Sequence, residues 1–207
     1  EGAVFKRGWF RYFEFRPDVY VLPGGALAIT RDCHVFTSVD PAASERQSAD
    51  YTAIVTMALT PVGDVLILDM VRERLGVERI VPKLAEVCRQ WGPEWVAFEA
   101  DNFQVGVARQ AARHHDIPTV QEMRSGLHGK LVRAHAAIVR TEQGRVYLPV
   151  GAAWVDDFLD ETASFTGNDA PHDDQVDAFA QGIRALDRYD WVSDSKPEVL
   201  VGGFSRR

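Results

Sequence analysis

Three β-prone segments followed by alternating helices and strands constrain the fold more than any other feature of the sequence. Residues 34–39, 52–59 and 65–71 are rich in Val, Ile, Thr and Phe, and the turn-forming residues 61–64 separate the last two segments. Short connections between successive strands are typical of an antiparallel meander. We therefore expect these three segments to form adjacent antiparallel strands.

The rest of the chain alternates between two periodicities. Apolar residues recur every three or four positions where we expect helices, and short apolar runs lie between these segments. The predicted helices cover 77–91, 102–115, 130–141, 154–165 and 172–186, and the predicted strands cover 95–98, 118–122 and 145–148. This order predicts an α/β fold with a central mixed β-sheet, in which an antiparallel meander of three strands is joined by parallel strands and flanked by helices.

The ends of the chain differ from this main region. Residues 1–31 are rich in aromatic residues and arginine and are broken by Pro and Gly, so we expect strand-like or irregular structure packed on the main domain. We interpret residues 1–31 as a connector segment, 32–188 as the main domain and 189–207 as a flexible tail. The chain does not begin with Met, which indicates a fragment or a processed product.

Composition excludes several classes of protein. No apolar run approaches the roughly 18–20 residues needed to span a bilayer, and no secretory signal pattern is present. Cys33 and Cys88 lack the spacing of zinc ligands, so we expect reduced thiols. The net charge of −7 disfavours a nucleic-acid partner when taken alone, although a site for divalent metals is itself acidic.

Two acidic residues lie at the ends of predicted strands. Asp40 follows the strand at 34–39 and precedes Pro41, and Glu99 follows the strand at 95–98. Ligands of α/β sheets gather beyond the carboxyl ends of the strands. If these two strands are parallel neighbours, both carboxylates face one crevice, although Asp40 could equally be a simple turn residue before proline.

A third acidic group lies at the start of the last predicted helix. At about 100° per residue, Asp173 and Asp177 differ by roughly 40°, and Asp174 and Asp177 differ by roughly 60°. All three side chains can therefore point to one side, close to the apolar stripe. Acidic residues are also common in a first helical turn because the helix dipole favours them there, and this alternative stays open for Asp173 and Asp174.

Carboxylates gathered from three segments would repel one another unless a cation is bound. Mg²⁺ and Mn²⁺ prefer such hard oxygen ligands. Two ions about 3.5–4 Å apart can activate a water and stabilise the leaving oxygen in phosphodiester cleavage. A shared site for divalent metals is therefore one interpretation of the pattern, beside the turn and helix-start roles given above.

The same residues carry a family resemblance. The motifs are Phe36-Thr37-Ser38-Val39-Asp40-Pro41-Ala42, Ser48-Ala49-Asp50-Tyr51-Thr52, Val96-Ala97-Phe98-Glu99, Gly144-Arg145-Val146-Tyr147-Leu148-Pro149 and His172-Asp173-Asp174-Gln175-Val176-Asp177-Ala178, with the lead-in Phe5-Lys6-Arg7-Gly8-Trp9-Phe10-Arg11-Tyr12. In order and spacing they resemble the C-terminal nuclease domain of phage terminase large subunits over about residues 3–187.

This resemblance implies an RNase H-like fold and a metal-dependent endonuclease that cuts concatemeric viral DNA during packaging in the host cytoplasm. It implies that Asp40 bridges two Mg²⁺ or Mn²⁺ ions and that Glu99 binds one of them. Asp174 would complete the second ion site with Asp173 or Asp177 assisting, and these residues would be the metal ligands, with Asp40, Glu99 and Asp174 catalytic. The expected partners are double-stranded DNA, the ATPase domain and small subunit of the terminase, and the portal. The chain lacks a GxxxxGK[ST] motif, so no ATPase activity is expected from it.

Five basic residues are candidate DNA contacts: Arg72, Arg74, Arg124, Lys130 and Arg133. They lie near the predicted acidic site, and the glycine-containing segment Gly126–Gly129 is a candidate mobile DNA-binding loop. The alternative for each residue is an ordinary solvated surface cation. His172 is either a residue that supports the metal ligands or a helix-entry histidine.

Two other functions remain open at this stage. One is another RNase H-like enzyme, such as a junction resolvase or a transposase core. The other is a docking module that contacts a portal or capsid and has lost catalysis. The three acidic positions argue against the docking module, because a silent site has no need to retain them.

Overall fold

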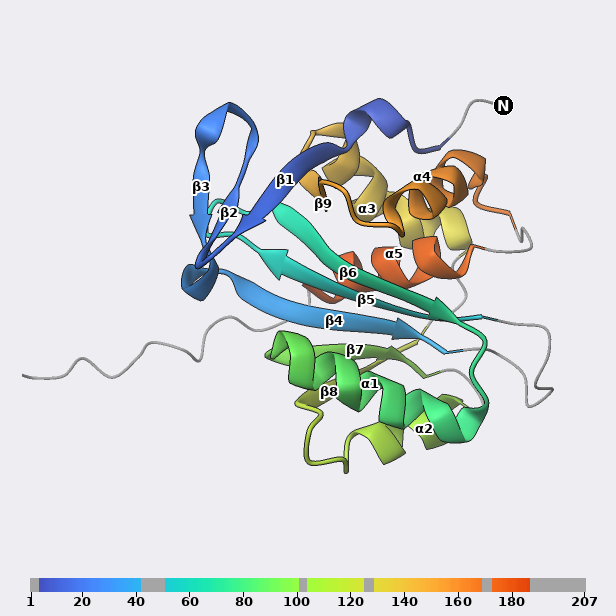
Figure 1. Cartoon of the computed structure of the whole chain (residues 1–207). Coiled ribbons are helices and arrows are strands. Elements are labelled where there is room, and N and C mark those ends of the chain that lie inside the picture. Colours follow the sequence, from blue (N-terminus) through green and yellow to red (C-terminus); the bar gives the residue numbers. More distant parts are fainter. Residues whose placement is uncertain (1–3, 42–50, 101–103, 125–128, 169–172, 187–207) are drawn as a thin grey trace, which may run out of the picture.

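The computed structural model describes residues 4–41, 51–100, 104–124, 129–168 and 173–186. A nine-stranded sheet, ordered β3-β2-β1-β9-β6-β5-β4-β7-β8, forms the centre of the protein (Figure 1). Its strands are β1 Arg11–Arg16, β2 Val19–Val21, β3 Leu27–Ile29, β4 His34–Asp40, β5 Thr52–Leu59, β6 Val65–Glu73, β7 Trp95–Glu99, β8 Thr119–Met123 and β9 Val146–Pro149. The helices are α1 Val77–Trp91, α2 Gln104–Ala111, α3 Lys130–Glu142, α4 Val155–Ser164 and α5 Asp174–Leu186.

The predicted mixed sheet is confirmed. β4, β5 and β6 form the antiparallel meander, with Asp40 opposite Ala53 and Thr52 opposite Glu73. Parallel strands extend the meander on both sides. On one side β7 pairs with β4 and β8 pairs with β7; on the other side β9 pairs with β6 and β1 pairs with β9. Consequently the carboxyl ends of β4, β7 and β8 lie at the same edge of the sheet.

The N-terminal segment contributes more regular structure than its sequence indicates. Residues 11–29 form β1, β2 and β3, and β1 pairs in parallel with β9. Phe5 and Phe10, which precede these strands, are buried in the same core cluster as Phe158 and Phe179 of the main region. The segment is therefore packed on the main domain. The predicted tail at 189–207 lies outside the described residues.

Helices cover both faces of the sheet. Figure 1 shows α3, α4 and α5 on one face and α1 and α2 on the other. The alternating side chains of β5 separate into the two cores: Val55 and Met57 belong to the cluster under α5, and Ile54 belongs to the cluster under α1. Because both faces are covered, the middle strands are buried on both sides, as their continuous apolar sequences predict.

Helix boundaries agree with the sequence except in one place. The structure has α1 over the predicted range, and α3, α4 and α5 match to within two residues. The prediction for α2 was too long, because the helix ends at Ala111 rather than near His115 and the chain then passes through turns. Within the described part of the chain, none of the helices combines the length and apolar character that crossing a membrane requires.

Helix α5 lies directly on β4 and β5, and a glycine permits this approach. A Cβ atom at Gly182 would clash with the Met57 side-chain methyl and would lie 3.0 Å from Cβ of Ser38. The side of α5 that carries Gly182 therefore has no room for a side chain. This close packing fixes the helix whose first turn carries Asp174 and Asp177, with Asp173 immediately before it.

We expect Gly182→Leu to lower the free energy of unfolding by about 1–3 kcal/mol or more, because overpacking forces the helix away from the sheet. Urea denaturation measures this change. Gly106→Leu is the matched control, since Gly106 is an exposed helical glycine whose Cβ would meet nothing within 4 Å. Equal stability of the Gly182→Leu variant and the wild type would show that the packing is looser than the structure indicates.

Candidate metal centre

Asp40 and Glu99 lie side by side because their strands are parallel neighbours. Val39 of β4 is in register with Phe98 of β7, so the next residue of each strand reaches the same edge. Burial, followed by a hydrogen bond to Glu99 and the negative charges of Glu99, Asp177 and Asp174, raises the pKa of Asp40 well above its ordinary value of 3.8. The predicted convergence of these carboxylates is therefore present.

The first turn of α5 adds the remaining acidic side chains. Asp174 and Asp177 both act electrostatically on Asp40, with Asp177 the stronger of the two. Burial, then the nearby charge of Asp173, raises the pKa of Asp177 to about 6, although Lys130 opposes this shift. Burial likewise raises the pKa of Asp174, against the opposing charge of Arg72. Like charges are thus gathered in a partly desolvated place.

Asp173 is turned toward a lysine. The Lys130 ammonium donates to both carboxylate oxygens of Asp173, at 2.8 and 2.7 Å, and lies 3.1 Å from Oδ2 of Asp177. Asp173 is 7% exposed. Burial alone would lower the pKa of Lys130, but the two carboxylates more than offset it and raise the pKa. Lys130 therefore remains charged and ties the start of α3 to the start of α5.

Two arginines that were predicted as DNA contacts also face the acidic cluster. Nη1 of Arg133 lies 3.7 Å from Oε1 of Glu99, and Nη2 of Arg72 lies 3.5 Å from Oδ2 of Asp174. Both arginine side chains are largely buried. Together with Lys130 they partly neutralise the cluster from three directions.

The other two predicted DNA contacts are placed differently. The Arg74 guanidinium is exposed and lies over the Tyr51 ring at 4.6 Å. Arg124 follows β8, and its backbone oxygen accepts a hydrogen bond from Arg184 at 3.2 Å. The segment 125–128 and His172 lie outside the described residues. The roles expected for the glycine-containing loop and for that histidine stay predictions.

Three polar residues that the sequence analysis did not single out hold the cluster in place. Gln181 of α5 donates to Oγ of Ser38 at 3.1 Å and to the Val39 backbone oxygen at 3.0 Å. Gln104 of α2 donates to the backbone oxygen of Pro41 at 2.9 Å. These bonds secure the chain on both sides of Asp40. The third residue is Glu161 of α4, whose carboxylate accepts hydrogen bonds from the start of α5. A glutamine in an otherwise apolar helix stripe is the sequence signal that could have revealed Gln181.

Another group of potential metal ligands is already engaged. Among the described residues, His114, His115 and Asp116 place ligand atoms within 4.8 Å of one another. Oδ2 of Asp116 lies 2.6 Å from Nη1 of Arg89, which neutralises the carboxylate. This group lies just before β8, at the end of the sheet opposite Glu99.

The described acids of the main cluster do not gather as tightly. No three of Asp40, Glu99, Asp173, Asp174 and Asp177 bring ligand atoms within 4.8 Å of one another. Lys130 and Arg72 contact three of these five carboxylates. The arrangement is a loose cluster of acids whose members contact basic side chains.

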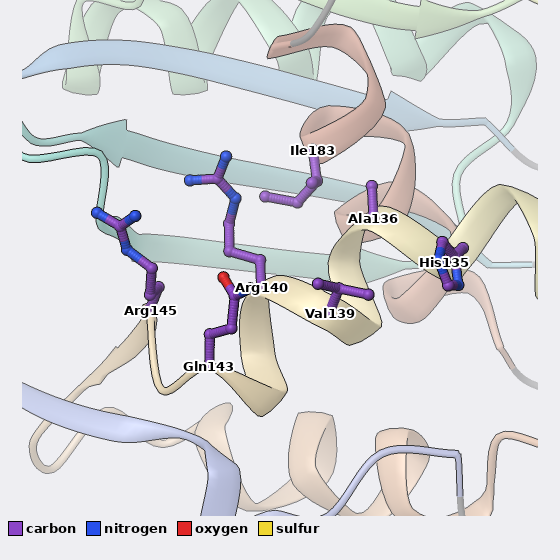
Figure 2. A pocket seen from close by; sticks show the side chains of 7 residues that line it. All are labelled: His135, Ala136, Val139, Arg140, Gln143, Arg145 and Ile183. Carbon is purple, nitrogen blue, oxygen red and sulfur yellow. The ribbon is translucent and has the colours of Figure 1, made fainter.

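A cavity of about 290 Å³ is lined by residues of α3 and by Ile183 of α5 (Figure 2). Its arginines are committed to the turn between β5 and β6: Arg140 donates to the backbone oxygen of Gly63 at 2.6 Å, and Nε of Arg145 donates to Oδ1 of Asp64 at 3.0 Å. This turn is at the far end of β5 from Ala53, which faces Asp40. The cavity therefore does not belong to the acidic site.

Comparison with known proteins agrees with this architecture. Residues 37–186 match the family described as the terminase RNaseH-like domain. No curated protein sequence matches the chain.

Solved structures with the same fold include several viral nucleases. The large terminase nuclease of thermophilic phage G20c shares 19% identity over 91% of this chain and 100% of its own, with a TM-score of 0.61. The large terminase nuclease domain of Thermus phage P74-26 shares 14% identity over 87% and 93%, with a TM-score of 0.60. The nuclease domain of the large terminase subunit gp2 of bacterial virus Sf6 shares 10% identity over 72% and 87%, with a TM-score of 0.54. Since the family match spans most of the 207 residues and includes both strand-end carboxylates, this chain belongs to the family of terminase RNase H-like domains.

Proposed function

We propose that this chain is the endonuclease domain of a viral genome-packaging terminase large subunit and hydrolyses double-stranded DNA with two divalent cations, Mg²⁺ or Mn²⁺. The observation that carries the proposal is the pairing of Asp40 with Glu99 at one sheet edge, opposite the first turn of α5. In the full terminase the substrate is concatemeric DNA, and the ATPase domain, the small subunit and the portal are the partners.

The chemistry of the side chains fits divalent cations. Buried carboxylates that raise one another's pKa are destabilising when ionised, and a hard cation removes that cost. Asp40 would contact both ions and Glu99 one of them. Asp174, with Asp173 or Asp177, would hold the other. Related proteins support the use of divalent cations, since the G20c nuclease has been solved with bound zinc, magnesium and cobalt and a variant of the Sf6 domain with manganese.

Two bound ions supply an activated water and stabilisation of the leaving oxygen in phosphodiester hydrolysis. The protein's own residues set the geometry. Asp40 and Glu99 are held on a rigid sheet, and Gln181 fixes the strand just before Asp40. Lys130 and Arg133 lie beside the carboxylates, and we infer that a phosphate backbone would approach on this side. These features favour an enzyme over a silent docking module.

We expect Asp40→Asn to reduce plasmid cleavage in Mg²⁺ or Mn²⁺ by on the order of 100-fold or more, because the ligand shared by both ions is lost. Agarose gel assays, with EDTA as the blank, measure the effect. Circular dichroism should show an intact fold, since neutralising a buried carboxylate removes repulsion. The control is Asp157→Asn, an exposed residue of α4 that should cut normally. Normal cleavage by the Asp40→Asn variant would remove the assigned chemistry.

Metal binding should strengthen as the pH rises through about 6, the raised pKa of Asp177. A carboxyl with a raised pKa binds its proton more tightly when folded, so without cations its contribution to stability is present at low pH and is lost as the pH rises. Cations must displace these protons. We therefore expect MgCl₂ to raise the melting temperature more at pH 8 than at pH 5.5, as measured by differential scanning fluorimetry. An equal increase at both pH values would show that these carboxyls do not bind the ion.

Arg74 is an exposed candidate for a DNA contact, and Arg74→Gln should weaken binding of a duplex oligonucleotide independently of its sequence. Loss of one phosphate contact should lower the slope of log K against log salt by about 1. Fluorescence anisotropy in EDTA measures this slope. Arg113→Gln, an exposed arginine near the opposite end of the sheet, is the control. If both variants have the wild-type slope, Arg74 does not contact the backbone.

A further inference from the structure

Glu161 is a buried carboxylate that plays no part in the proposed metal ligation. It lies in the last turns of α4 and is 8% exposed. Its Oε2 accepts a hydrogen bond from Nε2 of Gln175 at 2.7 Å, and its Oε1 accepts one from the Val176 backbone N–H at 2.9 Å. Glu161 thus satisfies a free amide at the start of α5, although it belongs to a different helix.

The same carboxylate faces an arginine that reaches the metal centre. Nε of Arg72 lies 3.8 Å from Oε2 of Glu161, and Nη2 of Arg72 lies 3.5 Å from Oδ2 of Asp174. The Arg72 guanidinium also stacks on the Tyr51 ring at 3.9 Å. Its Nε is buried without a hydrogen-bond partner. One guanidinium is therefore shared between two carboxylates and is not fully committed to either.

This sharing affects the charge that a cation would meet at Asp174. A guanidinium this close to Asp174 opposes a divalent cation on the same carboxylate by direct repulsion. Glu161 balances the positive charge and gives Arg72 a second carboxylate to interact with. Without the Glu161 charge, Arg72 would act as an uncompensated competitor for Asp174.

We propose that Glu161 is a positioning residue whose negative charge restrains Arg72 and so keeps Asp174 available to a divalent cation. This inference rests on the proposed function, because it requires a cation at Asp174. Glu161 then has two separate roles: its hydrogen bonds hold the first turn of α5, and its negative charge restrains Arg72. A role limited to capping α5 would need only the hydrogen-bond acceptors.

The Glu161→Gln variant removes the charge. Its amide oxygen can still accept from the Val176 N–H, and the Gln175 amide can turn so that its oxygen accepts from the new NH₂ group. Mn²⁺ titration by calorimetry without DNA should show about tenfold weaker binding than in the wild type. Arg72→Gln should bind Mn²⁺ at least as tightly as the wild type. The double variant Glu161→Gln/Arg72→Gln should recover most of the loss, since the competitor is gone. Asp157→Asn is the exposed control on the same helix.

Two results would overturn the inference: wild-type affinity in Glu161→Gln, or a double variant as weak as Glu161→Gln alone. If Glu161→Gln does not fold, Arg72→Gln decides, because weaker Mn²⁺ binding by that variant contradicts competition. Failure of the proposed function is recognised separately. The proposed function fails if the wild-type protein does not bind Mn²⁺, or if Asp40→Asn binds Mn²⁺ as tightly as the wild type. The inference about Glu161 then fails as well.

Discussion

The parallel pairing of β4 with β7 is the constraint on which the acidic site depends. Antiparallel neighbours would place Asp40 and Glu99 at opposite edges of the sheet, whereas the observed register brings them together. The strands that carry them are buried on both faces, so the carboxylates cannot separate without exposing core residues such as Phe98. The sheet's stability is therefore what forces two like charges together.

The position of α5 is the second requirement, and three different contacts set it. Gly182 allows the helix to touch β4 and β5, Gln181 binds the backbone of β4 beside Asp40, and Glu161 holds the first turn from α4. None of these contacts involves the acids themselves. The helix can therefore present Asp174 and Asp177 toward the sheet at a distance that packing determines. Rigid support of this kind is what a site for small ions needs.

Local patterns in the sequence predicted the elements well, but long-range contacts were less accessible. Strand-end carboxylates were recognisable because an apolar run stops at Glu99 and a proline follows Asp40. The position of β9 between β1 and β6 could not be recognised, because the sequence of a short strand does not indicate which strands it pairs with. Lys130 was predicted to bind DNA. Its contacts with Asp173 and Asp177 could not be foreseen, because these residues lie 43 or more positions away in the sequence. Glu161 had no distinguishing sequence signal, because it is one of four acidic residues in α4.

The basic residues beside the acids explain how such a cluster tolerates its own charge. Lys130, Arg72 and Arg133 each contact a carboxylate of the cluster, so part of the repulsion is relieved within the protein. Full neutralisation by lysine or arginine would close the site, because each direct ion pair competes with a metal ion for the same oxygens. The structure avoids this at Asp40, whose pKa stays raised by burial and by acidic neighbours. Burial and acidic neighbours therefore all act in the same direction on Asp40, which suits the ligand that we propose to be shared by two cations.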